Sequence, residues 1–190
     1  STKHMMSYLE ITSFIASILA VWLTIQKNKW CWFWNALSAL LYSIYFAQIQ
    51  LIADAILQYF FIIVSVFGFY QWHEIKNPIE TKLTYLNNRN RLAIGLFAIC
   101  LTWIMGKTLE LYTLASLPYL DSFCFALSII ATILAIKKYI DNWPIWIFTN
   151  AIYIAMYIYK AAYLTAFLYG LFFVLAFKGW MTWKKQLAIN

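Results

Sequence analysis

The chain has 190 residues, of which 64% are hydrophobic, 21% aromatic and only 11% charged, and its formal net charge is +7. A soluble domain is typically about half apolar and about a quarter charged, so this composition excludes an ordinary water-soluble protein. It predicts a membrane protein. Because the apolar runs are long and unbroken, we expect membrane-spanning α-helices rather than the alternating strands of a closed barrel.

Polar clusters divide the chain into seven predicted membrane spans. In chain order they cover residues 8–25, 31–47, 51–72, 92–106, 119–136, 143–159 and 164–183. Each reaches or approaches the ~20 residues that cross a bilayer core, and the fourth is the shortest. Residues 1–5 are expected to be an expression-vector remnant outside the fold.

Two triplets of spans resemble each other. The first span aligns with the fifth without a gap. After a one-residue shift, Trp34 matches Trp146 and Ser38 matches Asn150; the shift then reverses, and a Gly-xxx-Trp pattern closes both triplets. Matches of this kind in the same order indicate a duplicated three-helix unit.

The duplication predicts a three-one-three arrangement in two parallel repeats. The expected parts are the first repeat (6–72), a cytoplasmic linker (73–91), a linker helix (92–106), an external loop (107–118), the second repeat (119–183) and a cytoplasmic tail (184–190). Parallel repeats related by an axis along the membrane normal are a transporter architecture, with the solute site between the repeats near the membrane midplane.

The basic residues provide an independent check on the number of spans. With seven spans, only Lys3, Lys107 and Lys160 of the 14 lysines and arginines fall on one side. The side rich in lysine and arginine is normally cytoplasmic, so the N-terminus is predicted outside and the C-terminus inside. This topology accounts for the net positive charge without a nucleic-acid partner.

Polar and aromatic residues form stripes on four of the predicted helices. The spacing places on one face of each helix the residues Trp34, Ser38 and Tyr42; Asp54 and Gln58; and Trp146, Asn150, Tyr153 and Tyr157. Tyr169 is the position of the second repeat that is equivalent to Gln58. Polar side chains at membrane depth cost free energy unless they have partners or water, so these faces are expected to point into the bundle.

The stripe predicts a site for a flat heterocyclic solute. Aromatic faces attract cations, each by ~0.5–2 kcal/mol, while amides and hydroxyls can hydrogen-bond the edge of a ring. Two other interpretations remain. The amides and hydroxyls can simply link helices, each contributing ~0.6–2 kcal/mol. Asp54 can be either a hydrated ion-pair partner or an acidic guide for an entering cation.

Two other classes of protein fit the residues less well. An integral-membrane enzyme needs an acid, base, nucleophile or metal cluster at one depth, and only Asp54 and Asp121 are clearly intramembrane acids. The three cysteines lie in separate apolar segments without metal-like spacing, so neither a metal nor a cofactor is expected. A structural subunit would not need a duplicated polar stripe.

Several motifs resemble the PnuC family of bacterial vitamin transporters. They are the Asp121 segment ending in a Lys-Lys pair, the sequence Asn142-Trp143 followed by Trp146-xxx-Asn150, and the Gly-xxx-Trp ending of both repeats. The resemblance covers residues 8–183 and implies a three-one-three fold related in architecture to SWEET sugar transporters.

The resemblance implies facilitated diffusion of an unphosphorylated vitamin across the bacterial inner membrane, with trapping by a cytoplasmic kinase. It also allows a homotrimer. Carried onto this chain, the family's site places Gln58, Trp146 and Asn150 first among the candidate residues. This chain has Ser38 where some nicotinamide riboside carriers have asparagine, and an acid at Asp54. These departures favour thiamine over nicotinamide riboside, and riboflavin, neutral and bulkier, ranks third.

Overall fold

The computed structural model describes the backbone of residues 2–48, 52–73, 82–113, 117–159, 161 and 163–189. Within the helices, the side chains of residues 2–7, 45–48, 52–57 and 164–165 lie outside the description. In the part described, the chain forms seven α-helices, which confirms the all-helical fold. The helices are α1 (Thr2–Ile25), α2 (Trp30–Gln48), α3 (Ile52–His73), α4 (Asn88–Tyr112), α5 (Pro118–Ile136), α6 (Asn142–Tyr159) and α7 (Tyr163–Ile189).

Three helices extend by several residues beyond the predicted spans. Helix α1 begins at Thr2, inside the segment expected to lie outside the fold. Helix α4 continues to Tyr112, so much of the external loop predicted for 107–118 is helical. Helix α7 continues to Ile189, so the predicted tail is helical as well. Hydropathy marks only the lipid-facing part of a helix, whereas backbone hydrogen bonding continues until a cap or a breaker ends it.

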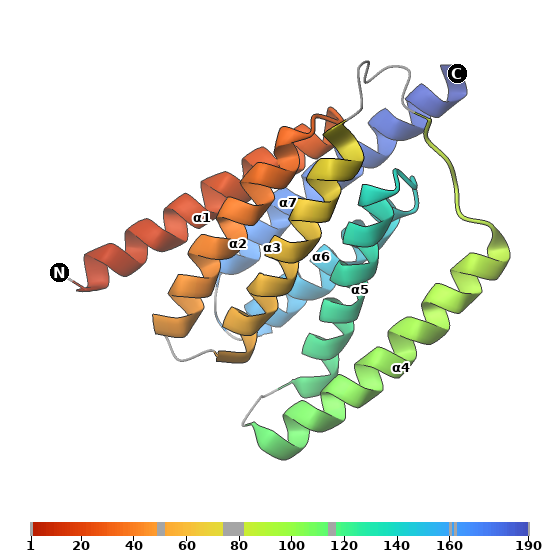
Figure 1. The fold of residues 1–190 in the computed structure, drawn as a ribbon. Coiled ribbons are helices and arrows are strands. Elements are labelled where there is room, and N and C mark those ends of the chain that lie inside the picture. Colours follow the sequence, from red (N-terminus) through yellow and green to blue (C-terminus); the bar gives the residue numbers. More distant parts are fainter. Residues whose placement is uncertain are drawn as a thin grey trace. The chain divides into compact units, whose positions relative to one another are not determined.

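The described chain divides into two compact units, Ser1–Thr81 and Lys82–Asn190. In the first unit, α2 packs against both α1 and α3 (Figure 1). In the second unit, α6 packs against both α5 and α7, while α4 packs along α5 (Figure 1). Each unit therefore contains a three-helix group in which the middle helix in sequence contacts the other two.

The chain just before α4 is held against the turn between α5 and α6. A carboxylate oxygen of Asp141 accepts a hydrogen bond from the backbone N–H of Leu86 at 2.8 Å, and the other accepts from Nε of Arg91 at 2.9 Å. Thr84 and Tyr139 form an isolated β-bridge. These contacts tie α4 to the second unit at its N-terminal end.

A pair of tryptophans recurs in both units. Trp32 of α2 meets Trp72 of α3 edge-on, with ring centroids 5.5 Å apart and planes at 89°. Trp143 of α6 meets Trp183 of α7 in the same way, at 5.3 Å and 89°. The identical geometry at corresponding ends of the helix pairs supports the duplication of the three-helix unit.

The turn between the first two helices of each three-helix group, α1–α2 and α5–α6, also recurs. Lys27 and Lys138 occupy corresponding positions and both adopt positive φ, at 53° and 60°. Burial lowers the pKa of Lys27 to about 8 and lowers the pKa of Lys138 as well. Trp32 and Trp143 then follow these lysines at the same distance along the chain. The two units thus stay in register through the turn and into the next helix.

The one-residue shift predicted before Trp34 is therefore wrong at the start of these helices. Because an α-helix advances by a constant rise and rotation, the unshifted start sets the match along its whole length. Ser38 then corresponds to Thr149 rather than to Asn150. The residue of α2 that corresponds to Trp146 is Asn35, one place after Trp34.

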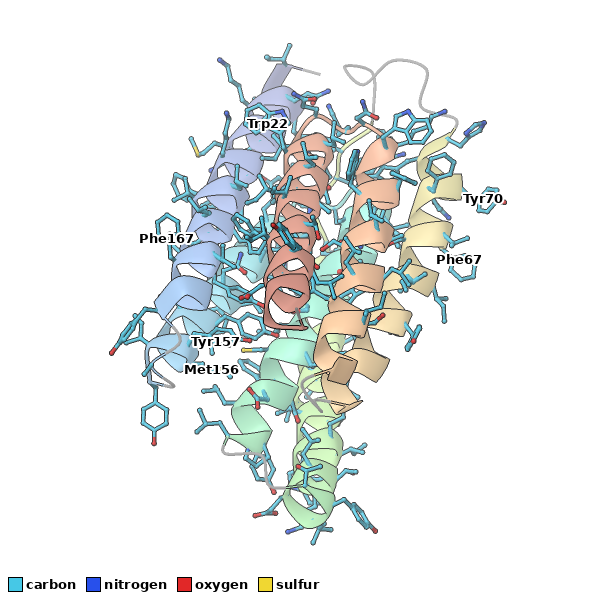
Figure 2. The ribbon with its side chains drawn as sticks, turned by 90° about the vertical axis from the view of Figure 1, so that its left-hand side faces the viewer. Trp22, Phe67, Tyr70, Met156, Tyr157 and Phe167 are labelled. Carbon is cyan, nitrogen blue, oxygen red and sulfur yellow. The ribbon has the colours of Figure 1, made fainter. Side chains whose placement is uncertain are left out.

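Each unit exposes apolar surface of the kind that suits lipid. Phe67 and Tyr70 point outward from α3, and Phe167 points outward from α7 (Figure 2). Counting the described residues alone, α1, α4, α5 and α7 each contain a stretch long and apolar enough to cross a membrane. Such surface is stable in a bilayer but would promote aggregation in water.

Candidate functional site

Trp146 and Asn150 lie one turn apart on α6. Asn150 is only 4% exposed and Trp146 is half-buried. Within the described part of the chain, the amide of Asn150 has no hydrogen-bond partner, whereas the neighbouring Thr149 donates to the carbonyl of Ile145 at 2.8 Å. A buried amide at membrane depth costs free energy unless water or a solute completes its hydrogen bonds. Asn150 is therefore the leading candidate for contact with a solute.

Three of the predicted tyrosines form one cluster. Tyr153 and Tyr157 of α6 stack at 6.1 Å between ring centroids. Tyr169 of α7 lies 4.5 Å from Tyr153 and 5.3 Å from Tyr157, the latter pair nearly parallel at 16°. The structure thus brings together rings from two helices of the second unit, and because these rings pack against one another, only the outer faces of the cluster are left for a solute.

In the first unit, Gln58, Tyr42 and Trp34 are all half-buried. The amide of Gln58 makes no hydrogen bond with another described residue. Trp34 packs edge-on against Phe33 at 5.6 Å. Gln58 matches Tyr169 in the unshifted alignment, and Tyr42 matches Tyr153, so these two first-unit positions correspond to members of the tyrosine cluster.

Ser38 lies in the contact between α1 and α2. It is 4% exposed, its hydroxyl donates to the carbonyl of Ser13 at 3.0 Å, and it also hydrogen-bonds the hydroxyl of Ser17. This arrangement fits the alternative in which a polar side chain links two helices. Asp54 was expected to be an ion-pair partner or an acidic guide for a cation, and its side chain lies outside the described part of the structure.

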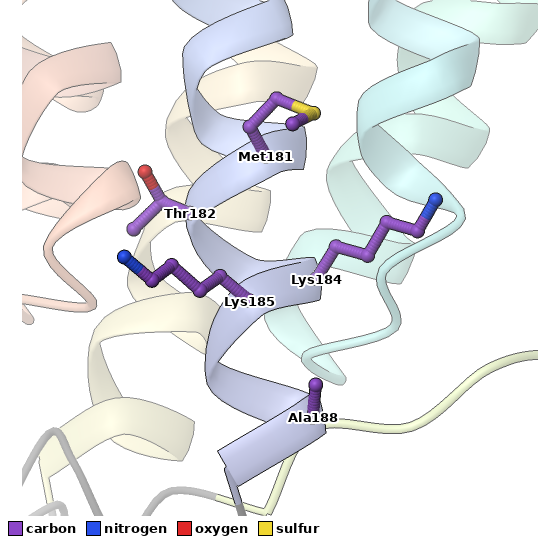
Figure 3. Close-up of a pocket in the computed structure, with 5 residues that line it drawn as sticks. All are labelled: Met181, Thr182, Lys184, Lys185 and Ala188. Carbon is purple, nitrogen blue, oxygen red and sulfur yellow. The ribbon is translucent and has the colours of Figure 1, made fainter.

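An open pocket of about 470 Å³ lies at the C-terminal end of α7. Its lining residues, Met181, Thr182, Lys184, Lys185 and Ala188, all come from this helix, and the two lysines extend to opposite sides of it (Figure 3). A surface made by one helix does not enclose a solute, so this pocket is separate from the predicted site.

Comparison with known proteins shows the family to which the chain belongs. A family model described as "Nicotinamide mononucleotide transporter" matches residues 7–185 of the chain. The chain belongs to this family. The nicotinamide riboside transporters PnuC of Escherichia coli (strain K12) and of Shigella flexneri are each 26% identical to it over 204 residues, covering 94% of this chain and 85% of theirs.

A solved structure shows the same fold. The crystal structure of the vitamin B3 transporter PnuC superposes with a TM-score of 0.79 and 21% identity, covering 96% of this chain and 83% of that one. This PnuC-family protein is therefore a transporter and not an enzyme. It is a multi-pass protein of the bacterial inner membrane, which confirms the class inferred from its composition.

The structure also shows what the sequence pattern missed on α2. With the units in register, the residues of α2 that match Trp146, Asn150 and Tyr153 are Asn35, Ala39 and Tyr42. The available signal was the constant numbering offset shared by the tryptophan pairs and the paired Gly-xxx-Trp endings.

Proposed function

We propose that this PnuC-family protein carries nicotinamide riboside across the inner membrane. Two of its curated relatives are named as nicotinamide riboside transporters and align over nearly the whole chain. The observation that carries the proposal is the amide of the buried residue Asn150, one turn from Trp146, which has no hydrogen-bond partner among the described residues. An indole face suits the cationic pyridinium ring, and an amide suits its carboxamide or the ribose hydroxyls.

Thiamine is the second candidate. It is also a cationic aromatic, and the acidic residue Asp54 and the serine at Ser38 were the features that favoured it in the sequence. The relatives support nicotinamide riboside instead. Because Ser38 is already bonded to α1, one of the two arguments for thiamine is weakened.

Binding to the purified protein tests the proposal directly. The dissociation constants of nicotinamide riboside, thiamine and riboflavin would be measured in detergent by isothermal titration calorimetry. We expect nicotinamide riboside to bind most tightly. Tighter binding of thiamine would transfer the assignment to the second candidate, and binding of none of the three would reject a vitamin carrier of this kind.

The variant Asn150→Leu tests the site. It removes the amide while keeping a similar side-chain volume, so we expect binding to weaken by more than ~1 kcal/mol. The matched control is Thr149→Val, one residue away, because the Thr149 hydroxyl already bonds within its own helix. Equal affinities in both variants would remove Asn150 from the site.

We include Gln58, Trp146 and the tyrosine cluster among the residues that contact the solute.

The proposed mode is facilitated diffusion by alternating access. Phosphorylation by a cytoplasmic vitamin kinase then adds charge to the solute and prevents its return. The accompanying topology has a three-one-three, SWEET-like arrangement, with the N-terminus outside and the C-terminus in the cytoplasm. A homotrimer is proposed as the assembly, and light scattering coupled to gel filtration would measure its mass.

A further inference from the structure

Asn35 of α2 and Ser65 of α3 form a polar pair inside the first unit. The side-chain nitrogen Nδ2 of Asn35 donates to Oγ of Ser65 at 2.8 Å. Ser65 is 2% exposed and Asn35 is half-buried. The pair lies on the same face of the α2–α3 contact as Trp32, whose ring packs against Gly68.

The hydrogen-bond chain determines which way the amide of Asn35 points. The hydroxyl of Ser65 donates its single hydrogen to the carbonyl of Phe61 at 2.6 Å. Oγ of Ser65 can therefore only accept from Asn35, which requires the nitrogen of the amide to face Ser65. The carbonyl oxygen Oδ1 of Asn35 then faces away from Ser65, and it has no donor among the residues that the structure describes.

The alignment of the two units shows which residue of the second unit corresponds to Asn35. It corresponds to Trp146, and its partner Ser65 corresponds to the buried Ala176. At ~1.5 Å per residue, Asn35 and Trp146 both lie about 6–8 Å inside the N-terminal end of their helices. An amide oxygen without a donor at this depth costs free energy unless water or a solute supplies one.

We propose that Asn35, held by Ser65, is a solute-binding residue of the first repeat that accepts a hydrogen bond from the transported vitamin. Ser65 is a positioning residue, because it keeps the amide turned so that the carbonyl oxygen is free. The donor on the solute is an amide N–H or a hydroxyl, and nicotinamide riboside carries both. This inference rests on the proposed function and replaces Ser38 with Asn35 as the polar contact from α2.

The test measures affinity and stability together in three variants. Asn35→Leu removes the amide, Ser65→Ala removes its anchor, and Ser38→Ala is the matched control, since Ser38 is a buried serine on the same helix that bonds to α1 instead. Dissociation constants for nicotinamide riboside and thiamine would be measured by calorimetry, and melting temperatures would be measured in the same detergent.

We expect Asn35→Leu to raise the dissociation constant of the transported vitamin by about tenfold and Ser65→Ala to raise it by about threefold. We expect Ser38→Ala to lower the melting temperature and to leave affinity within about twofold of the wild type. This split distinguishes solute binding from helix packing, because a purely structural pair would change the melting temperature alone.

Unchanged affinity in Asn35→Leu, with the wild-type protein binding normally, would overturn the assignment. If Asn35→Leu does not fold, Ser65→Ala decides: unchanged affinity in that variant overturns the assignment, and weakened affinity supports it. A wild-type protein that binds neither vitamin would instead reject the proposed function, so the two failures can be told apart.

Discussion

Asn150 and Ser38 are both buried polar residues in the middle of apolar helices, yet they have different surroundings. Ser38 is satisfied by α1, through Ser13 and Ser17. Asn150 has no hydrogen-bond partner among the described residues. Both are 4% exposed, so burial alone does not separate them, and the deciding property is whether a neighbouring helix supplies a donor or acceptor.

At the same scale, Gly179 allows a close approach that a larger residue would prevent. A Cβ at this position would lie 2.6 Å from the ring of Trp143, and an added methyl group would therefore push apart α6 and α7. We expect Gly179→Ala to lower the free energy of unfolding by about 1–3 kcal/mol, which a lower melting temperature in detergent would show.

The matched control for Gly179→Ala is Gly95→Ala on α4, where an added Cβ meets no atom within 4 Å. Gly68→Ala in the first unit should resemble Gly179→Ala, because Gly68 faces the ring of Trp32 in the same way. Equal melting temperatures for Gly179→Ala and Gly95→Ala would contradict this role.

At the scale of elements, α4 is an integral part of the second unit. It packs along α5, and a small core of Leu86, Ala98, Ile130 and Leu134 joins the two helices and the preceding segment. At its other end, Glu110 of α4 accepts a hydrogen bond from the hydroxyl of Tyr119 of α5 at 3.1 Å, while the ion pair of Lys107 with Glu110 at 2.8 Å lies within α4 itself. A helix tied at both ends is expected to move together with the second repeat.

Asp141 holds the N-terminal end of α4 against the turn between α5 and α6, because its carboxylate accepts hydrogen bonds from both the Leu86 N–H and Arg91. Asp141→Ala leaves the Leu86 N–H without its acceptor, so we expect the free energy of unfolding to fall by about 1–3 kcal/mol. Limited proteolysis before α4 and the melting temperature would report the change.

Two variants calibrate the effect of Asp141→Ala. Arg91→Ala should cost less, about 0–1 kcal/mol, because the Arg91 side chain is 49% exposed in its pair with Asp141. Arg89→Ala, at an exposed position close by, should have no measurable effect. If Asp141→Ala behaved like Arg89→Ala, the tie would not contribute to stability.

At the scale of the whole molecule, the basic residues and the apolar surface both reflect the membrane. Lysine and arginine gather on one predicted side, and large apolar side chains are exposed on both units. The proposed transport mode also belongs to this scale, because alternating access involves the protein as a whole.

We expect proteoliposomes to take up nicotinamide riboside only until the inside and outside concentrations are equal, and a proton ionophore to leave the rate unchanged. Enclosing a nicotinamide riboside kinase with ATP should raise total uptake several-fold, because the phosphorylated product leaves the equilibrium. Radiolabelled substrate measures both effects. Accumulation above the outside concentration without a kinase would show that transport is coupled to another gradient.

The sequence by itself determined that the protein is a helical membrane protein, it predicted a duplicated three-helix unit, and its motifs indicated the PnuC family. These properties follow from local composition, from the length of apolar runs and from matches along the chain, which do not depend on contacts between distant segments. The central residues of each helix were predicted for the same reason. The predicted spans ending at Ile25 and Ile136 end at the same residues in the structure.

Only the tertiary structure decided the register of the repeats, the hydrogen bonds of Ser38 to α1, the clustering of Tyr153, Tyr157 and Tyr169, and the tie between Asp141 and the start of α4. Each depends on which side chains from separate helices meet. Apolar helices align almost equally well with or without a one-residue shift, so the sequence pattern could not choose between Asn35 and Ser38. A one-residue shift turns a helix by about 100°, which moves a side chain from one neighbouring helix to another.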